Sequence, residues 1–371
     1  MHWFLLIFSA PYFFLLLWLY SRLRKIKRYN PAHRTSDVMI SVVIACRNES
    51  HNLKNILPDI AGQDYPPEMF EVVVVDDNST DNTFENASGF TNIKNLKAIK
   101  NKGIGKKMAI TTGVNAASGE LIITTDADCR MGKNWLITIG SFYSRNKPAM
   151  IICPVILQPG SGFFVKFQEL EFLSLQGVTA GSAAGGTATM CNGANLAFSR
   201  EIFLRHTKNI HYEILSGDDV FLLHSLKNEK GSKISWLEAP EATVTAAHAE
   251  TPYMFIRQRN RWISKGKAFK DRFTIFLAIV TFVTIILQVF TLVAGIFDPR
   301  FLLAFLIILA FKSVPDFLIL NNTAGRYGKK KLLRWFIPSQ LIYPFYVLAV
   351  TLSLTGNGGK KYFSSPSPKG I

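Results

Sequence analysis

Cysteine is scarce in this sequence. The chain of 371 residues contains four cysteines. They are widely separated and form no CxxC pair: Cys46, Cys129, Cys153 and Cys191. This spacing indicates neither a zinc site nor a disulfide framework, so we expect the four residues to be reduced and to serve in packing. The phosphate-binding pattern GxxxxGKS/T is also missing, which argues against an ATPase of that type.

Acidic residues are outnumbered by basic ones. The sequence has 26 Asp and Glu against 42 Lys and Arg, which gives a formal net charge of +16. A nucleic-acid-binding protein would gather such charge in a patch or groove of a soluble domain. Here basic stretches adjoin apolar runs instead, at 21–28 (SRLRKIKR) and 326–334 (RYGKKKLLR), as on the cytoplasmic side of membrane helices. We therefore predict an integral membrane protein that contacts a lipid bilayer and binds no nucleic acid.

Four apolar runs are each close to the roughly 20 residues that span a bilayer core. The first, at 2–20, has its positive charges after it, unlike a cleaved signal peptide, and we expect it to be retained with its N-terminus outside. The other three lie at 274–297, 301–320 and 335–354. In the second of these three, Lys312 and Asp316 are one helical turn apart and could pair with each other or face the protein interior.

The last apolar run contains Pro338 and Pro344 and precedes lysines that favour the inside, so it either crosses the membrane or is re-entrant. The runs predict four segments and, as the location, the inner membrane of a bacterial cell. These segments are an N-terminal transmembrane anchor at 1–28, a cytoplasmic domain at 38–270, C-terminal transmembrane helices at 271–356 and a polar tail at 357–371.

The predicted cytoplasmic domain has the pattern of an α/β fold. Short β-branched runs end in polar residues, as buried parallel strands do, at 39–45, 70–75, 121–125 and 150–153. Residues 52–63 can supply a crossover helix, although we expect Pro58 to disturb it. This alternation predicts a doubly wound, mostly parallel sheet, in which ligands bind beyond the carboxyl ends of the strands.

Polar residues follow the first two predicted strands. Arg47 and Glu49 come after the first, and the second runs into DDNSTD at 76–81. Loops at the ends of adjacent parallel strands would form a crevice suited to a base and a ribose. DDNSTD can equally be an ordinary loop with a helix N-cap, because Ser, Thr, Asp and Asn are the preferred capping residues.

The third predicted strand runs into two carboxylates, Asp126 and Asp128. At positions i and i+2 of an extended segment they point the same way, and paired buried carboxylates repel and need a cation. Mg²⁺ or Mn²⁺ suits this role because each accepts oxygen ligands from carboxylate and phosphate together. Such an ion also stabilises a departing nucleoside diphosphate as a Lewis acid. A lone DxD is frequent in exposed loops, so its meaning depends on its surroundings.

Two further segments carry charge at predicted helix starts. Lys106 follows the glycines of GIGKK, which fits a contact to a phosphate group or a plain solvated turn. GDD at 217–219 opens an amphipathic helix. Acids are favoured there by the helix dipole alone, or one of them takes a proton from an acceptor hydroxyl.

The segment QRNRW ends the predicted domain just ahead of the C-terminal apolar runs. On a helix Gln258 and Arg261 share a face, so both can reach a diphosphate, while Trp262 offers a flat surface to a sugar ring. The alternative is a membrane-interface belt, where Trp and Arg are also common.

In chain order, the motifs VVVVDDNS, GKK, DAD, CNGAN, GDDxxLL and QRNRW resemble those of the membrane-bound family 2 glycosyltransferases. This group contains cellulose, chitin, hyaluronan and poly-N-acetylglucosamine synthases and ceramide glucosyltransferases. The resemblance covers roughly 41–265 and the membrane layout on both sides. Each motif is weak alone, but the ordered set is specific. It implies a GT-A fold, Rossmann-like with a mostly parallel sheet, and an inverting, metal-dependent transfer that forms a β-linkage.

The resemblance also implies a role for each matching position. Asp219 would be the catalytic base and Asp128 the ligand of Mg²⁺ or Mn²⁺. The nucleotide sugar would contact Arg47, Glu49, Asp77, Lys106, Asp126, Gln258 and Arg261, and the acceptor would contact Asn192, Asp218 and Trp262. Two positions depart from the family pattern. Asp218 stands where a Glu is usual, and Arg47 stands where an aromatic residue is often found.

The leading hypothesis is an inverting membrane glycosyltransferase that moves a hexose or N-acetylhexosamine from a UDP-sugar to a lipid or saccharide acceptor at the cytoplasmic membrane face. A processive β-polysaccharide synthase is the alternative within the same chemistry. QxxRW favours it, but about four spans are few for a channel. A nucleotidyltransferase with a related α/β core is a third possibility and would release pyrophosphate. The sequence identifies no protein partner.

Overall fold

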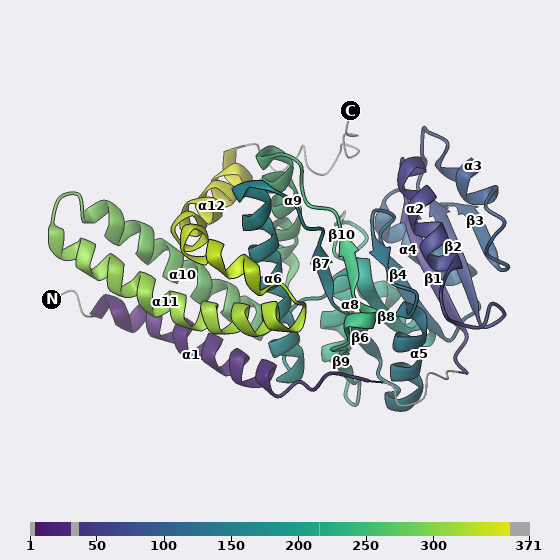
Figure 1. The fold of residues 1–371 in the computed structure, drawn as a ribbon, viewed down its shortest axis with the longest axis horizontal. Coiled ribbons are helices and arrows are strands. Elements are labelled where there is room, and N and C mark those ends of the chain that lie inside the picture. Colours follow the sequence, from purple (N-terminus) through teal and green to yellow (C-terminus); the bar gives the residue numbers. More distant parts are fainter. Residues whose placement is uncertain (1–3, 31–36, 215, 357–371) are drawn as a thin grey trace. The chain divides into compact units, whose positions relative to one another are not determined.

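The computed structural model describes residues 4–30, 37–214 and 216–356. Over these residues the chain divides into an α/β unit, at 27–30, 37–158, 190–214 and 216–247, and a helical unit, at 4–26, 159–189 and 248–356 (Figure 1). This division differs from the predicted range 38–270, because helices α6 (Gly162–Ala184) and α9 (Pro252–Ser264) group with the helical unit. The predicted polar tail, with Lys360, Lys361 and Lys369, lies outside the described residues.

The α/β unit is built on a mostly parallel sheet. Over the described residues it has seven strands in the order β3-β2-β1-β4-β8-β6-β9, of which β8 runs antiparallel to both its neighbours. The strands are β1 (Ile40–Cys46), β2 (Phe70–Asp76), β3 (Leu96–Lys100), β4 (Leu121–Thr125), β6 (Met150–Ile152), β8 (Leu196–Ser199) and β9 (Ile234–Trp236). The four predicted strands are therefore confirmed to within one residue at each end.

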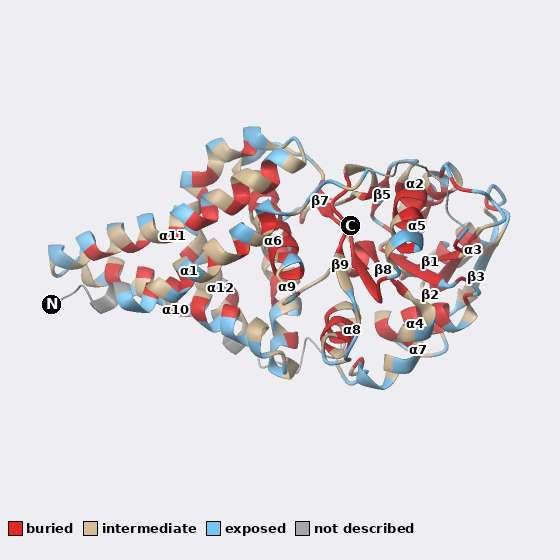
Figure 2. Ribbon diagram, turned by 90° about the horizontal axis from the view of Figure 1, so that it is seen from below, coloured by how far each residue is buried: buried red, intermediate tan, exposed pale blue. Residues whose placement is uncertain are grey.

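A smaller sheet of β5 (Arg130–Met131), β10 (Val244–Ala246) and β7 (Val155–Leu157) accompanies it. Figure 2 shows the strands of the main sheet as mostly buried, in keeping with their β-branched composition. Cys46, Cys129 and Cys153 are buried free thiols, and Cys191 is a partly exposed one. The predicted role in packing fits the three buried thiols, and the prediction that the cysteines are reduced stays a prediction.

The strand register places the carboxyl ends of the central strands at one edge of the sheet. Cys46 pairs with Asp76, and Asp76 with Lys100. β4 runs parallel to β1, so it ends at the same edge. Because β8 runs the other way, its first residue, Leu196, pairs with Thr124 there. The loops after β1 to β4 and the loop before β8 therefore share the edge at which ligands bind in doubly wound sheets.

Helices pack on this sheet through close apolar contacts. They are α2 (Ser50–Ala61), α3 (Thr83–Ser88), α4 (Lys106–Ala116), α5 (Trp135–Asn146), α7 (Arg200–His206) and α8 (Asp218–Lys227). α4 lies close against β1 and β2 at Gly113, where a Cβ atom would come within 2.5 Å of Val43 Cγ1 and 3.0 Å of Val75 Cγ2. This close approach requires glycine and fixes the start of α4 relative to the sheet edge.

Pro58 does not break α2. The helix continues through it, and the Gly62 N–H donates to the Pro58 carbonyl at 3.0 Å, so the expected disturbance was wrong. A proline removes one backbone hydrogen bond. Here the helix also buries an apolar face, whose burial offsets that loss. The residues of this face are Leu53, Ile56, Leu57 and Ile60.

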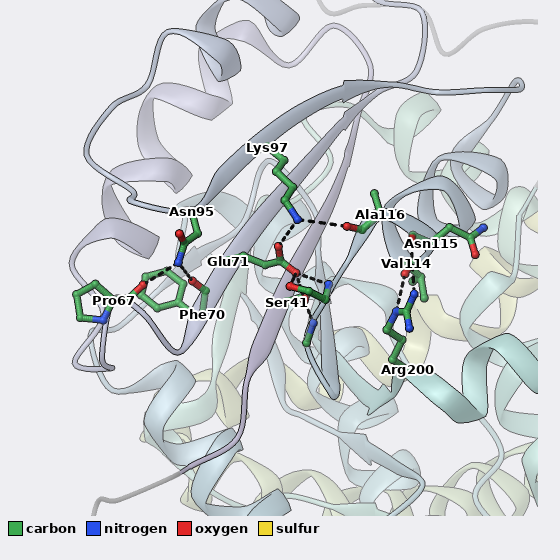
Figure 3. Close-up of polar contacts among 12 residues, drawn as sticks. Ser41, Pro67, Phe70, Glu71, Asn95, Lys97, Val114, Asn115, Ala116 and Arg200 are labelled. Atoms are coloured by element: carbon green, nitrogen blue, oxygen red, sulfur yellow. Dashed lines mark hydrogen bonds and ion pairs between the residues drawn. The ribbon is translucent and has the colours of Figure 1, made fainter.

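Glu71 is a buried carboxylate near the start of β2, at the opposite end of the strand from Asp76 (Figure 3). It accepts hydrogen bonds from Ser41 Oγ at 2.6 Å, from Lys97 Nζ at 2.7 Å and from the Ser118 N–H. Burial alone would raise the pKa of Glu71, but these hydrogen bonds lower it to about 2 from an ordinary 4.5. The carboxylate therefore links β1, β2 and β3 as a structural ion.

Replacing this carboxylate, Glu71→Gln, is expected to lower the free energy of unfolding near pH 7 by about 2–3 kcal/mol. Because the folded-state pKa is depressed, the stabilisation is present above the ordinary pKa of 4.5 and is lost as the pH falls toward 2. Denaturation of the detergent-purified protein at about pH 7 and about pH 3 should give a smaller difference at the lower pH. Glu68→Gln changes an exposed carboxyl and serves as the control. Equal losses at both pH values would contradict this role.

The helical unit contains long apolar helices. Among the described residues, three stretches are long and apolar enough to cross a membrane: Arg272–Ala294, Pro299–Arg326 and Lys330–Leu354. They contain α10 (Arg272–Ala294), α11 (Pro299–Arg326) and most of α12 (Phe336–Gly356). α1 (Phe4–Arg24) does not meet these criteria over its described part, so its role as an anchor stays a prediction. Many residues of α10 and α11 are exposed (Figure 2), and large apolar residues are among them, as lipid-facing residues would be.

A buried polar network links α1, α11 and α12. Lys312 Nζ lies 2.6 Å from Asp316 Oδ2, so the predicted pair is confirmed. Tyr12 donates to the other carboxylate oxygen at 2.6 Å. Gln340 accepts from Lys312 at 3.1 Å and donates to Asp316 at 2.9 Å. Charges among apolar helices need such partners because hydrocarbon supplies none, so the network fixes how these three helices face one another.

Candidate functional site

The loops after β1 and β2 are tied together by side chains of DDNSTD. Asn48 has a positive φ of 58°, its N–H donates to Ser79 Oγ at 2.9 Å, and its Oδ1 accepts from the Thr80 N–H at 2.7 Å. The Glu49 N–H donates to Thr83 Oγ1 at 2.8 Å. Asp81 also accepts from the Thr83 N–H at the start of α3. DDNSTD thus bonds to the first residue of α3, whose N-cap is the next residue, Asn82, and also shapes the loop that carries Arg47 and Glu49.

Asp77 organises the loop after β3. It is buried, and both its oxygens accept from the Gly105 N–H at 3.0 Å, while Oδ1 also accepts from Asn101 Nδ2 at 2.7 Å. Gly105 is the residue before α4, so a carboxylate lies where the helix dipole favours negative charge. Asp77 therefore holds the GIGKK turn in place through its carboxylate. Its contact with a nucleotide stays a prediction.

Lys106, the first residue of α4, interacts with both acidic pairs. Its ammonium forms an ion pair with Asp126, and the two side chains are 39% and 36% exposed, so solvent screens the pair and its effect on stability is small. Burial alone would lower the pKa of Lys106, but the carboxylates of Asp126, Asp218 and Asp219 raise it. The charge of Lys106 also acts on Asp128. One lysine therefore contacts Asp126 and lies within electrostatic range of the predicted metal ligand and the predicted base.

Asp128 lies just beyond β4. Its side chain is exposed, and partial desolvation by the surrounding loops together with the Asp126 charge raises its pKa above the ordinary value. Glu49 is affected similarly, because burial and the charges of Asp128 and Asp126 raise its pKa while a hydrogen bond from Asn52 opposes the shift. Excess negative charge thus gathers at the carboxyl end of β4.

This charge distribution suits a divalent cation shared with a bound diphosphate. Within the described residues, no group of three or more His, Cys, Asp or Glu side chains is arranged to hold a metal ion. A cation at Asp128 would then need further oxygen ligands from phosphate or water, which Mg²⁺ and Mn²⁺ readily accept. Asp126 and Asp128 therefore fit a metal that arrives with its nucleotide rather than a closed structural site.

Asp219 is in the first turn of α8, and its Oδ2 accepts from the Gly193 N–H at 3.1 Å. Gly217, just before the helix, has a φ of 97°, which an L-residue adopts only with strain. Asn192 accepts from the Ala194 N–H at 3.0 Å and so caps the short helical turn at Gly193–Asn195. The CNGAN and GDD motifs, 26 residues apart at Gly193 and Asp219, thus meet through a backbone hydrogen bond.

Sequence reasoning assigned no role to Gly193 or Asn195. Asn195 is fully buried, accepts from Trp135 Nε1 at 3.0 Å, and donates to the Pro154 and Ala242 carbonyls at 2.8 Å each. It anchors the turn whose Gly193 N–H holds Asp219. The sequence did contain a signal for Asn195, which directly precedes the apolar run LAF. An Asn beside a buried strand is expected to be buried itself, and a buried amide needs several hydrogen-bond partners.

Arg47 follows β1, as predicted. Its Nε is buried and has no hydrogen-bond partner within the described part of the chain. Leaving a buried donor unsatisfied costs free energy, so a bound ligand that accepts from this atom would gain affinity. The predicted contact of Arg47 with the nucleotide stays a prediction.

The QRNRW segment belongs to the helical unit, where it forms part of α9. Arg259 is buried there, with Nε 3.0 Å from Glu171 Oε1 and its guanidinium 4.1 Å from the Trp262 ring. Gln258 Oε1 accepts from Arg259 Nη1 at 2.6 Å, and Arg261 is exposed. Arg259 therefore holds the segment in its own unit. The predicted contacts of Gln258, Arg261 and Trp262 with donor and acceptor stay predictions.

Comparison with known proteins identifies a matching family and similar proteins. Residues 41–206 match the family described as Glycosyl transferase family 2. The β-monoglucosyldiacylglycerol synthase of Nostoc sp. is 26% identical over 65% of this chain and 51% of its own length. The poly-β-1,6-N-acetyl-D-glucosamine synthase of Staphylococcus epidermidis is 25% identical over 43% of this chain and 39% of its own. The chain thus spans about half or less of these two relatives.

A solved structure extends the comparison to nearly the whole chain. It is described as the mannosyltransferase PcManGT from Pyrobaculum calidifontis in complex with GDP-Man and Mn²⁺. The alignment covers 96% of this chain and 99% of that one, with a TM-score of 0.60 and 20% identity. At 20% identity, this similarity shows that the two proteins share a fold. Residues 41–206 therefore carry a family 2 glycosyltransferase domain, and the Rossmann-like, mostly parallel sheet is that of the GT-A fold.

Proposed function

We propose that this protein is an inverting membrane glycosyltransferase. It transfers a hexose or N-acetylhexosamine from a nucleoside diphosphate sugar, with UDP as the first candidate, to a lipid or saccharide acceptor at the cytoplasmic membrane face. The observation that carries the proposal is the position of Lys106 at the start of α4: it forms an ion pair with Asp126, and its charge acts over a longer distance on Asp128, Asp218 and Asp219. A diphosphate leaving group needs carboxylates that hold a metal ion, here Asp126 and Asp128. An acceptor hydroxyl that loses its proton needs a carboxylate base, here Asp219, and both must be near the same anomeric carbon.

In this reaction Asp219 is the general base. Its Oδ2, oriented by the Gly193 N–H, accepts the proton of an acceptor hydroxyl while that oxygen bonds to the anomeric carbon of the donor sugar. The bond between this carbon and the diphosphate oxygen breaks, and the nucleoside diphosphate leaves with the bonding electrons. Attack from the face opposite the leaving group inverts the anomeric centre, and Asp218 orients the acceptor beside the base.

Donor-side residues bind and orient the diphosphate. Lys106 offers its ammonium to the phosphates, and Asp77 keeps the loop before α4 in the conformation that presents this ammonium. Arg47 supplies an unsatisfied donor for the base or ribose. Mg²⁺ or Mn²⁺ would be held by Asp128, with Asp126 beside it, and would neutralise charge on the leaving diphosphate. The Mn²⁺ and GDP-Man in the Pyrobaculum mannosyltransferase, a protein of the same fold, support a metal and a nucleotide sugar.

The acceptor follows from the membrane helices and the relatives. Three apolar helices would hold the enzyme at a bilayer, where lipid acceptors are available. The names of the relatives point to diacylglycerol-based and N-acetylglucosamine-based products. We therefore favour a lipid acceptor with a free hydroxyl. The basic ends of α1 and α11 support the cytoplasmic side of a bacterial inner membrane for the catalytic domain.

Incubation of the purified protein with membrane lipids and a panel of nucleotide sugars tests this function. The panel contains UDP-glucose, UDP-galactose, UDP-N-acetylglucosamine and GDP-mannose, and the readouts are the nucleotide released and the mass of the lipid product. We expect release of a nucleoside diphosphate and addition of a single sugar. A ladder of products would instead favour the processive synthase, and release of pyrophosphate the nucleotidyltransferase. Failure of every donor would contradict the proposal.

A further inference from the structure

Lys107, next to the donor-side lysine, is used in a different way. It is 4% exposed, and its ammonium donates to the carbonyl oxygens of Ile210 at 2.8 Å and His211 at 2.7 Å. These carbonyls belong to the segment 207–214, between α7 and α8. A buried ammonium that donates to two backbone carbonyls satisfies groups that would otherwise be desolvated without partners. Lys107 therefore holds this segment against α4.

Two further contacts extend the attachment. The Lys107 ammonium also lies 4.5 Å from the centre of the Phe221 ring, in α8, an arrangement in which the ring face attracts the cation. One helical turn along α4, Thr111 Oγ1 lies 2.8 Å from the Tyr212 hydroxyl. One face of α4 thus contacts both the segment 207–214 and the beginning of α8.

The held segment leads directly to the proposed base. It is followed by Gly217, whose positive φ turns the chain into α8, and by Asp218 and Asp219 in the first helical turn. Lys106 and Lys107 are consecutive residues at the start of the same helix. One faces the carboxylates, and the other fixes the chain that carries two of them.

We propose that Lys107 is a positioning residue for the transfer reaction, which sets the distance between the Asp219 carboxylate and the donor side of the site by anchoring 207–214 to α4. This inference rests on the proposed function. Lys107 contacts neither donor nor acceptor in this scheme. It acts through the backbone, so its loss should impair proton transfer from a bound acceptor more than nucleotide binding. Misplacement of a catalytic group by about 1 Å is enough to slow a reaction by about 100-fold.

Kinetics of Lys107→Met in the full-length, detergent-purified protein test the proposal. We expect kcat for sugar transfer to fall by about 10- to 100-fold, with the dissociation constant of the nucleoside diphosphate unchanged within about twofold. Amide hydrogen exchange, measured by mass spectrometry, should accelerate in 207–214 while the central strands stay protected. Lys107→Arg, which keeps donors for both carbonyls, should recover most of the rate. Lys94→Met, at an exposed lysine before β3, is the matched control.

Thr111→Val is the second variant and removes a contact to the same segment with little change in volume. It should show the same pattern with a smaller fall in kcat, and it decides the matter if Lys107→Met does not fold. Wild-type kcat in the folded variants, or loss of nucleotide affinity in step with kcat, would overturn the positioning role. Faster exchange throughout the α/β unit would overturn it too. An inactive wild-type protein would instead overturn the proposed function, so the two failures can be told apart.

Discussion

Asp219→Asn is expected to lower kcat for sugar transfer by about 10²- to 10⁴-fold, the range that a positioned general base contributes. The amide is isosteric with the carboxylate, and its oxygen can still accept from the Gly193 N–H, although the bond that the other carboxylate oxygen accepts from the Val220 N–H is lost. One lost hydrogen bond in the first turn of α8 should leave the local fold in place. What it cannot do is take a proton. Because the leaving diphosphate is held by other residues in this scheme, the affinity for the nucleoside diphosphate should change by no more than about twofold.

The measurement pairs steady-state transfer with direct nucleotide binding, for example by calorimetry. Asp218→Asn, one residue away, should raise the acceptor KM with a smaller effect on kcat, because that carboxylate orients the acceptor rather than accepting its proton. Asp64→Asn changes an exposed carboxyl of the same unit and should leave all constants unaltered. Transfer by Asp219→Asn at the wild-type rate would remove Asp219 from its assigned role.

Asp128→Asn is expected to reduce transfer by about 10³-fold, and excess chelator should reduce wild-type activity to a similar extent. Desolvation and the neighbouring Asp126 charge disfavour ionisation of Asp128. A bound divalent cation would offset this repulsion between the two carboxylates. The variant keeps the shape of the side chain but loses the charge that attracts the ion. The affinity for Mn²⁺, measured by titration in the presence of nucleoside diphosphate, should fall together with the rate.

Restoration by added metal separates this effect from unfolding. Chelated wild-type protein should regain activity with Mg²⁺ or Mn²⁺, whereas Asp128→Asn should regain little. Asp126→Asn removes the ion-pair partner of Lys106 and should weaken nucleotide binding as well as turnover. Full turnover of the wild-type protein in excess chelator would show that no metal takes part, and Asp128 would then need another explanation.

The local pattern of the sequence was enough to predict much of the architecture. Buried parallel strands are recognisable because both faces of the sheet are covered, which leaves β-branched runs such as those that become β1 and β2. Apolar length likewise identified three candidate membrane helices. The polar residues after each strand were expected at one edge, because parallel strands end together. Each of these inferences depends only on residues that are neighbours along the chain, so it can be made from the sequence.

Pairwise contacts within the site depend on chain register and on crossovers, which are not local. Nothing in GIGKK reveals that the Gly105 N–H is held by Asp77, 28 residues earlier, or that Lys107 reaches a segment more than 100 residues later. The same holds for Gly193 and Asp219. Each contact requires that separate strands first align, so its partners can be identified only when the fold is known.

The sequence by itself determined the fold class, the candidate membrane helices and the order of the site motifs, because hydrophobic periodicity and loop composition are properties of consecutive residues. Only the tertiary structure decided which carboxylates share Lys106, and that Arg259 holds the QRNRW helix through Glu171. It also decided that α2 continues through Pro58. The first two contacts join residues far apart in the sequence and the third depends on a buried apolar face, and such energies depend on distance in space rather than on distance along the chain.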